Sequence, residues 1–145
     1  MAPSRSGDPF DLQRFVDAQE PAYARVCREL AAGQKQSHWI WYIFPQLRAL
    51  GRSSTAVRFG IGSRAEAVAY LTHPMLGSRL IECVRLMLAA RDRTLSEIMP
   101  FPDDLKFISS MTLFEAVAVD PVLFAEALVR FADGKRDATT LDYLA

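Results

Sequence analysis

The residues best suited to chemistry begin with an aromatic run, SHWIWYIFPQL, residues 37–47. It holds two Trp, a Tyr, a Phe, a histidine and a glutamine, and it carries no charged side chain. Flat aromatic walls with one imidazole and one amide suit a nucleobase or a nicotinamide-like ring, because ligand sites are mostly apolar with a few polar groups. The candidate ligand-binding residues of this run are His38, Trp39, Trp41, Tyr42, Phe44 and Gln46.

The same run is also typical of a buried element. A helix that is apolar on all sides is usually buried. In that case His38 and Gln46 would be hydrogen-bond partners for the Trp and Tyr polar atoms. The sequence alone leaves the choice between a core element and a pocket wall open.

A basic stretch with several glycines follows the aromatic run. Between Glu29 and Glu66 the chain has no acid and five bases, a local charge of +5. Glycine lets backbone N–H groups approach an oxyanion, and arginine binds phosphate or carboxylate through two parallel bonds. Alternatively, these cations are solvated or face residues 103–145, whose local charge is −4. The candidates for an anion site are Lys35, Arg52, Ser53 and Arg58.

A third segment, PDDLKFISSMTLF, residues 102–114, is expected to be helical. Lys106, Ser109 and Ser110 have the spacing that brings side chains to one side of a helix. A lysine beside serines can activate a nucleophile, bind a phosphate or belong to a structural hydrogen-bond cluster, and these alternatives stay open. All three residues are therefore candidate ligand-binding residues.

Catalysis on an N-glycosidic bond would require a carboxylate that stabilises a sugar cation or activates water, as in glycoside hydrolysis. Glu66 and Asp103 are the candidates. The two histidines, His38 and His73, have no Cys or carboxylate at ligand spacing. The glycine-rich motifs that bind dinucleotides or nucleoside triphosphates are also missing. The sequence therefore predicts no metal and no cofactor.

Helices must position these residues. Proline follows Asp8, Glu20, His73 and Asp120, which is typical of a first helical turn. Capping boxes are indicated by SRAE at 63–66 and TLSE at 94–97. We predict a mainly α, single-domain fold over 8–145, with at most a minor β element near 39–61, after a disordered segment 1–7. The expected helices are 9–18, 21–32, 36–44, 64–72, 74–91, 94–99, 103–118, 121–132 and 138–144.

Composition narrows the class of protein. The 145 residues are 50% hydrophobic and 23% charged, with zero net charge, which is ordinary for a globular domain and argues against nucleic acid as the partner. An apolar leader and an apolar run of membrane-spanning length are both missing, so we expect a cytoplasmic protein that does not bind membranes. The oligomeric state cannot be read from the sequence.

Several motifs resemble a known family. Lys35, SHWIWYIFPQL, LGRS at 50–53, EAVAYLTHPMLGSRL at 66–80 and PDDLKFISSMTLF resemble a bacterial family of uncharacterised proteins, domain of unknown function 1810, some of which carry the label calpastatin. The resemblance covers about residues 10–144 and implies a compact helical domain. A more distant similarity is to the helical superfamily that processes NAD and ADP-ribose. It rests on Gln19, Ile61, Ser63, Glu66, Ala67, His73, Pro74 and Leu76.

The superfamily similarity implies a pocket for a phosphorylated ribosyl compound, although the chain lacks the superfamily's Trp-Gly ending. The leading hypothesis is a domain that binds a small phosphorylated nucleoside or ADP-ribose-like ligand and hydrolyses its N-glycosidic bond if it is an enzyme. The alternative is a protein-interaction module without a small ligand.

Overall fold

The computed structural model describes residues 7–145. Over these residues the fold is mainly α, as predicted, with no β-strand and one isolated parallel bridge between Leu47 and Ile61. The expected disordered segment 1–7 lies outside the described residues except for Gly7. The helices are α1 (Gln13–Gln19), α2 (Tyr23–Ala31), α3 (Ile40–Ile43), the 3-10 turn η2 (Arg48–Leu50), α4 (Ser54–Arg58), α5 (Arg64–Thr72), α6 (Pro74–Ala89), α7 (Leu95–Ile98), α8 (Asp103–Val117), α9 (Val122–Ala132) and α10 (Ala138–Leu144).

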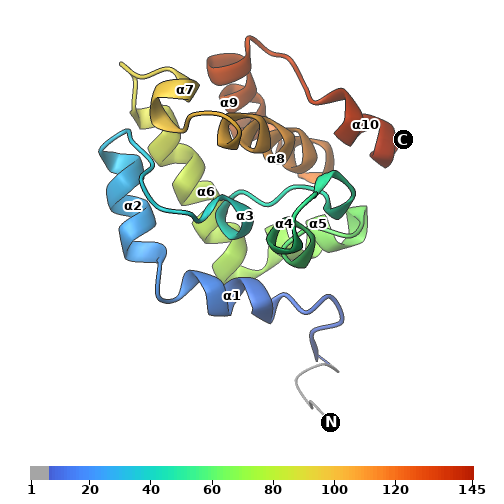
Figure 1. Cartoon of the computed structure of the whole chain (residues 1–145). Coiled ribbons are helices and arrows are strands. Elements are labelled where there is room, and N and C mark those ends of the chain that lie inside the picture. The colour runs from blue at the N-terminus through green and yellow to red at the C-terminus, as the bar shows by residue number, and fades with distance from the viewer. Residues whose placement is uncertain (1–6) are drawn as a thin grey trace.

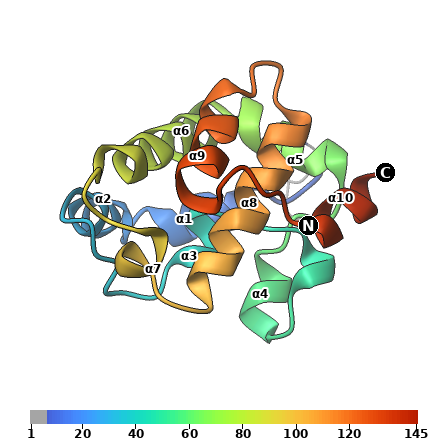
Figure 2. The same ribbon diagram turned by 90° about the horizontal axis from the view of Figure 1, so that it is seen from above.

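Helices α5, α6, α8 and α9 form the centre of the fold (Figure 1). Helix α6 packs against α2, α5 and α9, while α8 packs against α5, α9 and α10. The short helices α3 and α4 lie in front of this centre in Figure 1, between α1 below and α8 above. Seen from above, α4 stands on the side of the molecule away from α6 (Figure 2).

A line of aromatic contacts ties the central helices together. Phe15 meets Tyr70 edge-on with ring centroids 5.0 Å apart, Tyr70 lies 5.5 Å from Phe114, and Phe114 lies 6.0 Å from Phe124. All four side chains are buried. Aromatic pairs of this kind add about 0.5–1.5 kcal/mol each beyond the burial of their area. They join α1, α5, α8 and α9 into one core.

Several helix ends follow the expected local signals. Thr94 and Glu97 form a complete capping box at the start of α7. His73 begins α6, and its Nδ1 accepts hydrogen bonds from the backbone N–H groups of Met75 and Leu76. Gly33 adopts the left-handed conformation expected after α2, with φ of 70°. Local capping chemistry therefore sets these boundaries.

The segment 36–61 differs from the prediction. The helix expected over 36–44 is reduced to Ile40–Ile43, because the Glu29 carboxylate accepts hydrogen bonds from the backbone N–H groups of Gln36 and Ser37 and holds them out of a helix. Within the region near 39–61, where the sequence allowed a minor β element, the structure forms the short helices α3 and α4. The β character is limited to the Leu47–Ile61 bridge.

The bridge brings two chain segments very close together. The backbone N–H of Arg48 donates to the Ile61 carbonyl at 2.8 Å. A Cβ at Gly60 would lie 2.3 Å from the Arg48 Cα, so only glycine fits. This close approach fixes the loop that carries α4. Among residues 7–145, no helix is long and apolar enough to cross a membrane.

Candidate functional site

The aromatic run divides between the core and the surface. Trp39 and Phe44 are both 1% exposed and belong to the core. His38 is exposed, while Trp41 and Tyr42 are partly buried. The Tyr42 ring packs against Phe59 with centroids 5.4 Å apart. The run thus supplies both a core element and part of a surface site, and successive groups of residues take the two roles.

Glu29 organises the start of the run, although the sequence analysis did not single it out. Its Oε1 accepts hydrogen bonds from the N–H groups of Gln36, Ser37 and the Trp39 indole, at 2.8–2.9 Å. Its Oε2 accepts one from the Ser37 hydroxyl at 2.5 Å. Burial opposes ionisation, but these hydrogen bonds outweigh it and lower the pKa of Glu29 to about 2. The carboxylate is therefore a charged structural anchor for Trp39.

Lys35 and Lys106 both pair with Asp103 at the N-terminus of α8. The Lys35 Nζ lies 2.7 Å from the Asp103 Oδ2 and also donates to the Ser37 carbonyl at 2.6 Å. The Lys106 Nζ lies 3.9 Å from the Asp103 Oδ1, at the limit of an ion pair. The two ammonium groups also lie over indole rings, Lys35 over Trp39 at 4.9 Å and Lys106 over Trp41 at 5.6 Å. Lys35 is held tightly, whereas Lys106 keeps donors available for another acceptor.

Beside Lys106 lies a narrow crevice, which we call the Trp41 crevice. It opens between α3, α4 and α8 and is lined by Ile40, Trp41, Phe44, Gln46, Ala56, Phe59 and Lys106. A water-sized sphere can enter only about 10 Å³ of it, which is room for roughly one water molecule. In this conformation the crevice therefore admits a single oxygen atom or the edge of a ring, and a complete base does not fit.

Two side chains of the Trp41 crevice, those of Trp41 and Gln46, carry hydrogen-bond donors without acceptors among the described residues. The Trp41 indole N–H is buried and has no hydrogen-bond partner among the described residues. The Gln46 side chain forms no hydrogen bond in this part of the chain either, although its backbone carbonyl accepts from Ile61 at 2.9 Å. A buried donor left unpaired costs about 1–3 kcal/mol. An oxygen-rich ligand would satisfy it.

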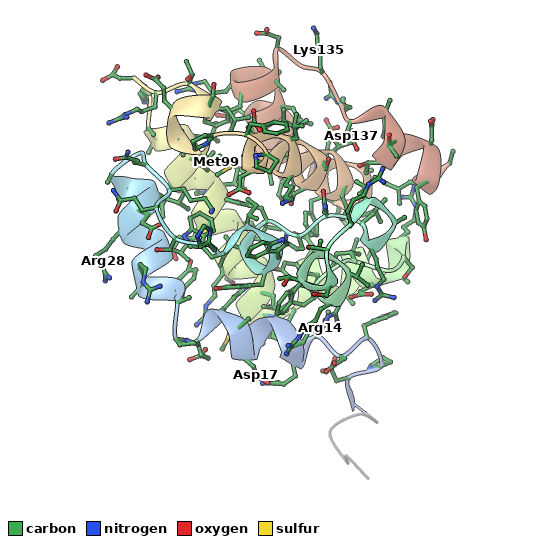
Figure 3. The ribbon with its side chains drawn as sticks, viewed as in Figure 1. Arg14, Asp17, Arg28, Met99, Lys135 and Asp137 are labelled. Atoms are coloured by element: carbon green, nitrogen blue, oxygen red, sulfur yellow. The ribbon has the colours of Figure 1, made fainter. Side chains whose placement is uncertain are left out.

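Glu66, the second candidate carboxylate, lies in a different environment. It is 3% exposed, and its Oε2 lies 2.7 Å from the Arg14 Nη2. Its Oε1 accepts from the Gly62 N–H at 2.9 Å. Arg14 projects from α1 (Figure 3) and also donates to the carbonyls of Arg58 and Gly60. The Glu66 carboxylate thus connects its own helix, α5, to α1 and to the loop after α4. The Arg14 guanidinium balances its charge.

The remaining candidates fall outside the Trp41 crevice. Arg52, Ser53 and Arg58 are exposed. Ser53 caps α4 by accepting from the Ala56 N–H at 3.1 Å, and Arg58 lies over the Phe59 ring. The structure therefore brings together Lys35, Trp41, Phe44, Gln46, Asp103 and Lys106, and leaves the arginines at the surface around α4.

Ser109 and Ser110 are buried in α8, at 7% and 0% exposure. The Ser110 hydroxyl has no hydrogen-bond partner in the described chain. Lys106, which the helical spacing placed beside them, forms its ion pair with Asp103 instead. Neither serine lines the Trp41 crevice.

Arg14 and Glu29 are the polar residues that sequence reasoning missed. Both act through partners distant in the chain: Arg14 meets Glu66, and Glu29 meets Trp39. Nothing local to Arg14 distinguishes it from a solvated arginine. For Glu29, the one available signal is that it is the last acid before the long acid-free stretch.

The comparisons with known proteins agree with this architecture. A family model described as "Protein of unknown function (DUF1810)" matches residues 9–144. A crystal structure of the conserved hypothetical protein Rv1873 from Mycobacterium tuberculosis is similar, with a TM-score of 0.92 and 49% sequence identity, over 94% of this chain and 97% of that chain. A search of the curated proteins found no match. The chain belongs to the DUF1810 family of proteins of unknown function.

Proposed function

We propose that this chain binds a small phosphorylated nucleoside or an ADP-ribose-like ligand at the Trp41 crevice. The observation that carries the proposal is the set of unsatisfied donors there. The Trp41 indole N–H is buried without a partner, and it lies beside the Gln46 amide and the Lys106 ammonium group. Phosphate, ribose and nucleobase carbonyl groups supply oxygen acceptors for these donors.

The size of the crevice determines how such a ligand would lie. One ligand oxygen enters and accepts a hydrogen bond from Trp41, while an anionic group remains outside near Lys106. The ring then lies at the mouth. We expect it to stack on Tyr42, which is partly buried and packs on Phe59 of the crevice wall. His38 belongs to the same aromatic run and is exposed. Trp39 and Phe44 would support this arrangement from the core.

Positive and negative side chains are balanced around the Trp41 crevice. A ligand would therefore be recognised by individual hydrogen bonds and not by a strong net positive charge. Lys106 is the one charged residue in the described lining of the crevice. Asp103 lies beside it but is already paired with Lys35, and the Asp104 carboxylate accepts from the Leu105 N–H. An anion at Lys106 would therefore compete with a weak 3.9 Å ion pair. Arg52 and Arg58 are exposed cations near α4, the helix that forms one wall.

Hydrolysis of an N-glycosidic bond is the reaction this arrangement would support, with Asp103 as the carboxylate. The Asp103 carboxylate lies 2.7 Å from the Lys35 ammonium group and would stabilise an oxocarbenium-like sugar. The distant similarity to NAD- and ADP-ribose-processing proteins motivates this choice of substrate. Three of the residues that carry this similarity, Gln19, Glu66 and His73, make structural contacts outside the crevice. The proposal therefore rests on the Trp41 crevice and not on these residues.

A thermal-shift panel tests the proposal, using ADP-ribose, NAD, mononucleotides, phosphate and sulfate. A ligand at a hundred times its dissociation constant adds about 2.7 kcal/mol, which raises Tm by several degrees. We expect a rise with a ribosyl phosphate that plain phosphate does not reproduce. Lys106→Met should reduce it, whereas the control Lys135→Met, at an exposed position after α9, should not. A wild-type chain unaffected by the whole panel would contradict the proposal.

The reaction is tested with the ligand that raises Tm. This ligand is incubated separately with the wild-type protein and with the Asp103→Asn variant. Release of the free base or nicotinamide by wild type alone would support hydrolysis. Binding without release would restrict the function to recognition.

A further inference from the structure

A groove between α6 and α9 is another concave feature that the described residues form. Its volume is about 960 Å³, far more than that of the Trp41 crevice. In Figure 2, α6 and α9 lie side by side on the part of the molecule away from α4. None of the residues lining this groove takes part in the proposed ligand site.

The α9 wall of the groove exposes apolar side chains. Val122 and Val129 are 64% and 63% exposed, and they lie two helical turns apart on one side of α9. Leu88 of α6 is partly buried and lines the same groove. An apolar strip of this kind marks an interaction surface when charged residues border it.

The charged residues that border the groove are complementary to each other. Arg85 on α6 and Glu126 on α9 line opposite walls. Neither side chain forms an ion pair or hydrogen bond within the described chain. By contrast, Arg130 at the end of the groove already donates to the carbonyls of Ala90, Arg91 and Arg93. Arg85 and Glu126 thus place unpaired charges of opposite sign on the two walls, while Arg91 and Asp120 also line the groove without an ion pair among the described residues.

We propose that the α6–α9 groove binds a second copy of this chain. A twofold axis places the α6 wall of one protomer against the α9 wall of its partner. Arg85 then faces Glu126 of the partner subunit, and the same pair forms again on the other side of the axis. The Val122 and Val129 strips meet near the axis and are removed from water. A different protein would need both charges at matching positions, whereas a second copy supplies them by symmetry.

The dimensions of the surface that α6 and α9 form predict a weak dimer. With 16 and 11 residues, α6 and α9 are about 24 Å and 16 Å long. Two adjacent helices are about 20 Å wide, so the face covers roughly 400 Å² per protomer. Stable interfaces bury about 800 Å² per partner. We therefore expect association in the micromolar range or weaker, with a strong dependence on protein concentration.

Sedimentation velocity of the full chain from about 2 to 500 μM tests this, with circular dichroism as the check on folding. We expect a concentration-dependent dimer that Glu126→Arg or Arg85→Glu alone weakens about tenfold or more. The double variant Arg85→Glu/Glu126→Arg should restore it, because the pair is re-formed with reversed signs. Val129→Glu should abolish the dimer, while Val68→Glu, at an exposed valine of α5, should leave it intact.

Three results would overturn the dimer. One is a wild-type chain that stays monomeric up to 500 μM, which would leave the groove to another protein. Another is a dimer that the single charge reversals do not affect. The third is a double reversal whose losses simply add, since charges that do not face each other cannot rescue one another.

Discussion

Replacement of Glu29 by glutamine should destabilise the chain through the loss of one buried charge. Glutamine has nearly the same shape, and its oxygen can keep accepting from Gln36, Ser37 and the Trp39 indole. Its amide nitrogen can donate to the Ser37 hydroxyl. The substitution therefore removes the charge and preserves the geometry, which separates electrostatics from packing.

The magnitude follows from the pKa of Glu29. This carboxyl has a pKa of about 2 in the folded chain, against an ordinary value of 4.5. That difference corresponds to about 3 kcal/mol of stability at pH 7. Because the folded pKa is the lower one, this stability is complete above about pH 4.5 and disappears as the pH falls toward 2. We expect Glu29→Gln to lose about 2–3 kcal/mol at pH 7 and little at pH 2.

Urea unfolding followed by tryptophan fluorescence at pH 7, 4.5, 3 and 2 measures this difference. The matched control is Asp92→Asn, because Asp92 is exposed and has no ion pair or hydrogen bond within residues 7–145. It should change stability by less than about 0.5 kcal/mol. If Glu29→Gln and wild type were equally stable at pH 7, or if their difference did not vary with pH, the reasoning about Glu29 would be refuted.

Three further substitutions test the scaffold by their effect on the free energy of unfolding in urea. Gly60→Ala should cost at least about 2 kcal/mol, because its Cβ would meet Arg48 backbone at 2.3 Å; a neutral result would mean that the loop moves freely. Thr94→Ala should cost about 1 kcal/mol through loss of the α7 capping box, and an unchanged midpoint would argue against it. Arg14→Met should cost about 3–5 kcal/mol, since it leaves the buried Glu66 carboxylate with only the exposed Arg48 guanidinium, 4.0 Å away; a loss below 1 kcal/mol would show that the Arg14–Glu66 pair is not important.

Much of the fold could be predicted because its signals are local. Thr94 and Glu97 are three residues apart, and His73 caps the turn that directly follows it, so a short stretch of sequence contains the whole interaction. The same holds for the long helices, whose apolar periodicity is sustained over many residues. The length of α3 could not be predicted in this way, because the Glu29 carboxylate that limits it belongs to a different helix.

The candidate site was only partly predictable for a related reason. The types of residue were visible in the sequence, including Lys35, Asp103 and Lys106, but their meeting depends on where α8 begins relative to the loop before α3. Trp39 and Trp41 look equivalent in the sequence. In the fold, Glu29 draws the Trp39 indole into the core while that of Trp41 turns to the crevice. Periodicity in a four-residue helix cannot separate these outcomes.

The unpaired Trp41 indole provides the most direct test of ligand binding. The chain has two tryptophans, so a ¹H–¹⁵N spectrum contains two indole signals, which Trp41→Phe assigns. The account predicts that ADP-ribose or a mononucleotide moves the Trp41 indole signal to lower field as a ligand oxygen accepts its hydrogen bond. The Trp39 signal, already bonded to Glu29, should stay in place. Saturating ligand that leaves the Trp41 signal unmoved would contradict a binding site in the Trp41 crevice.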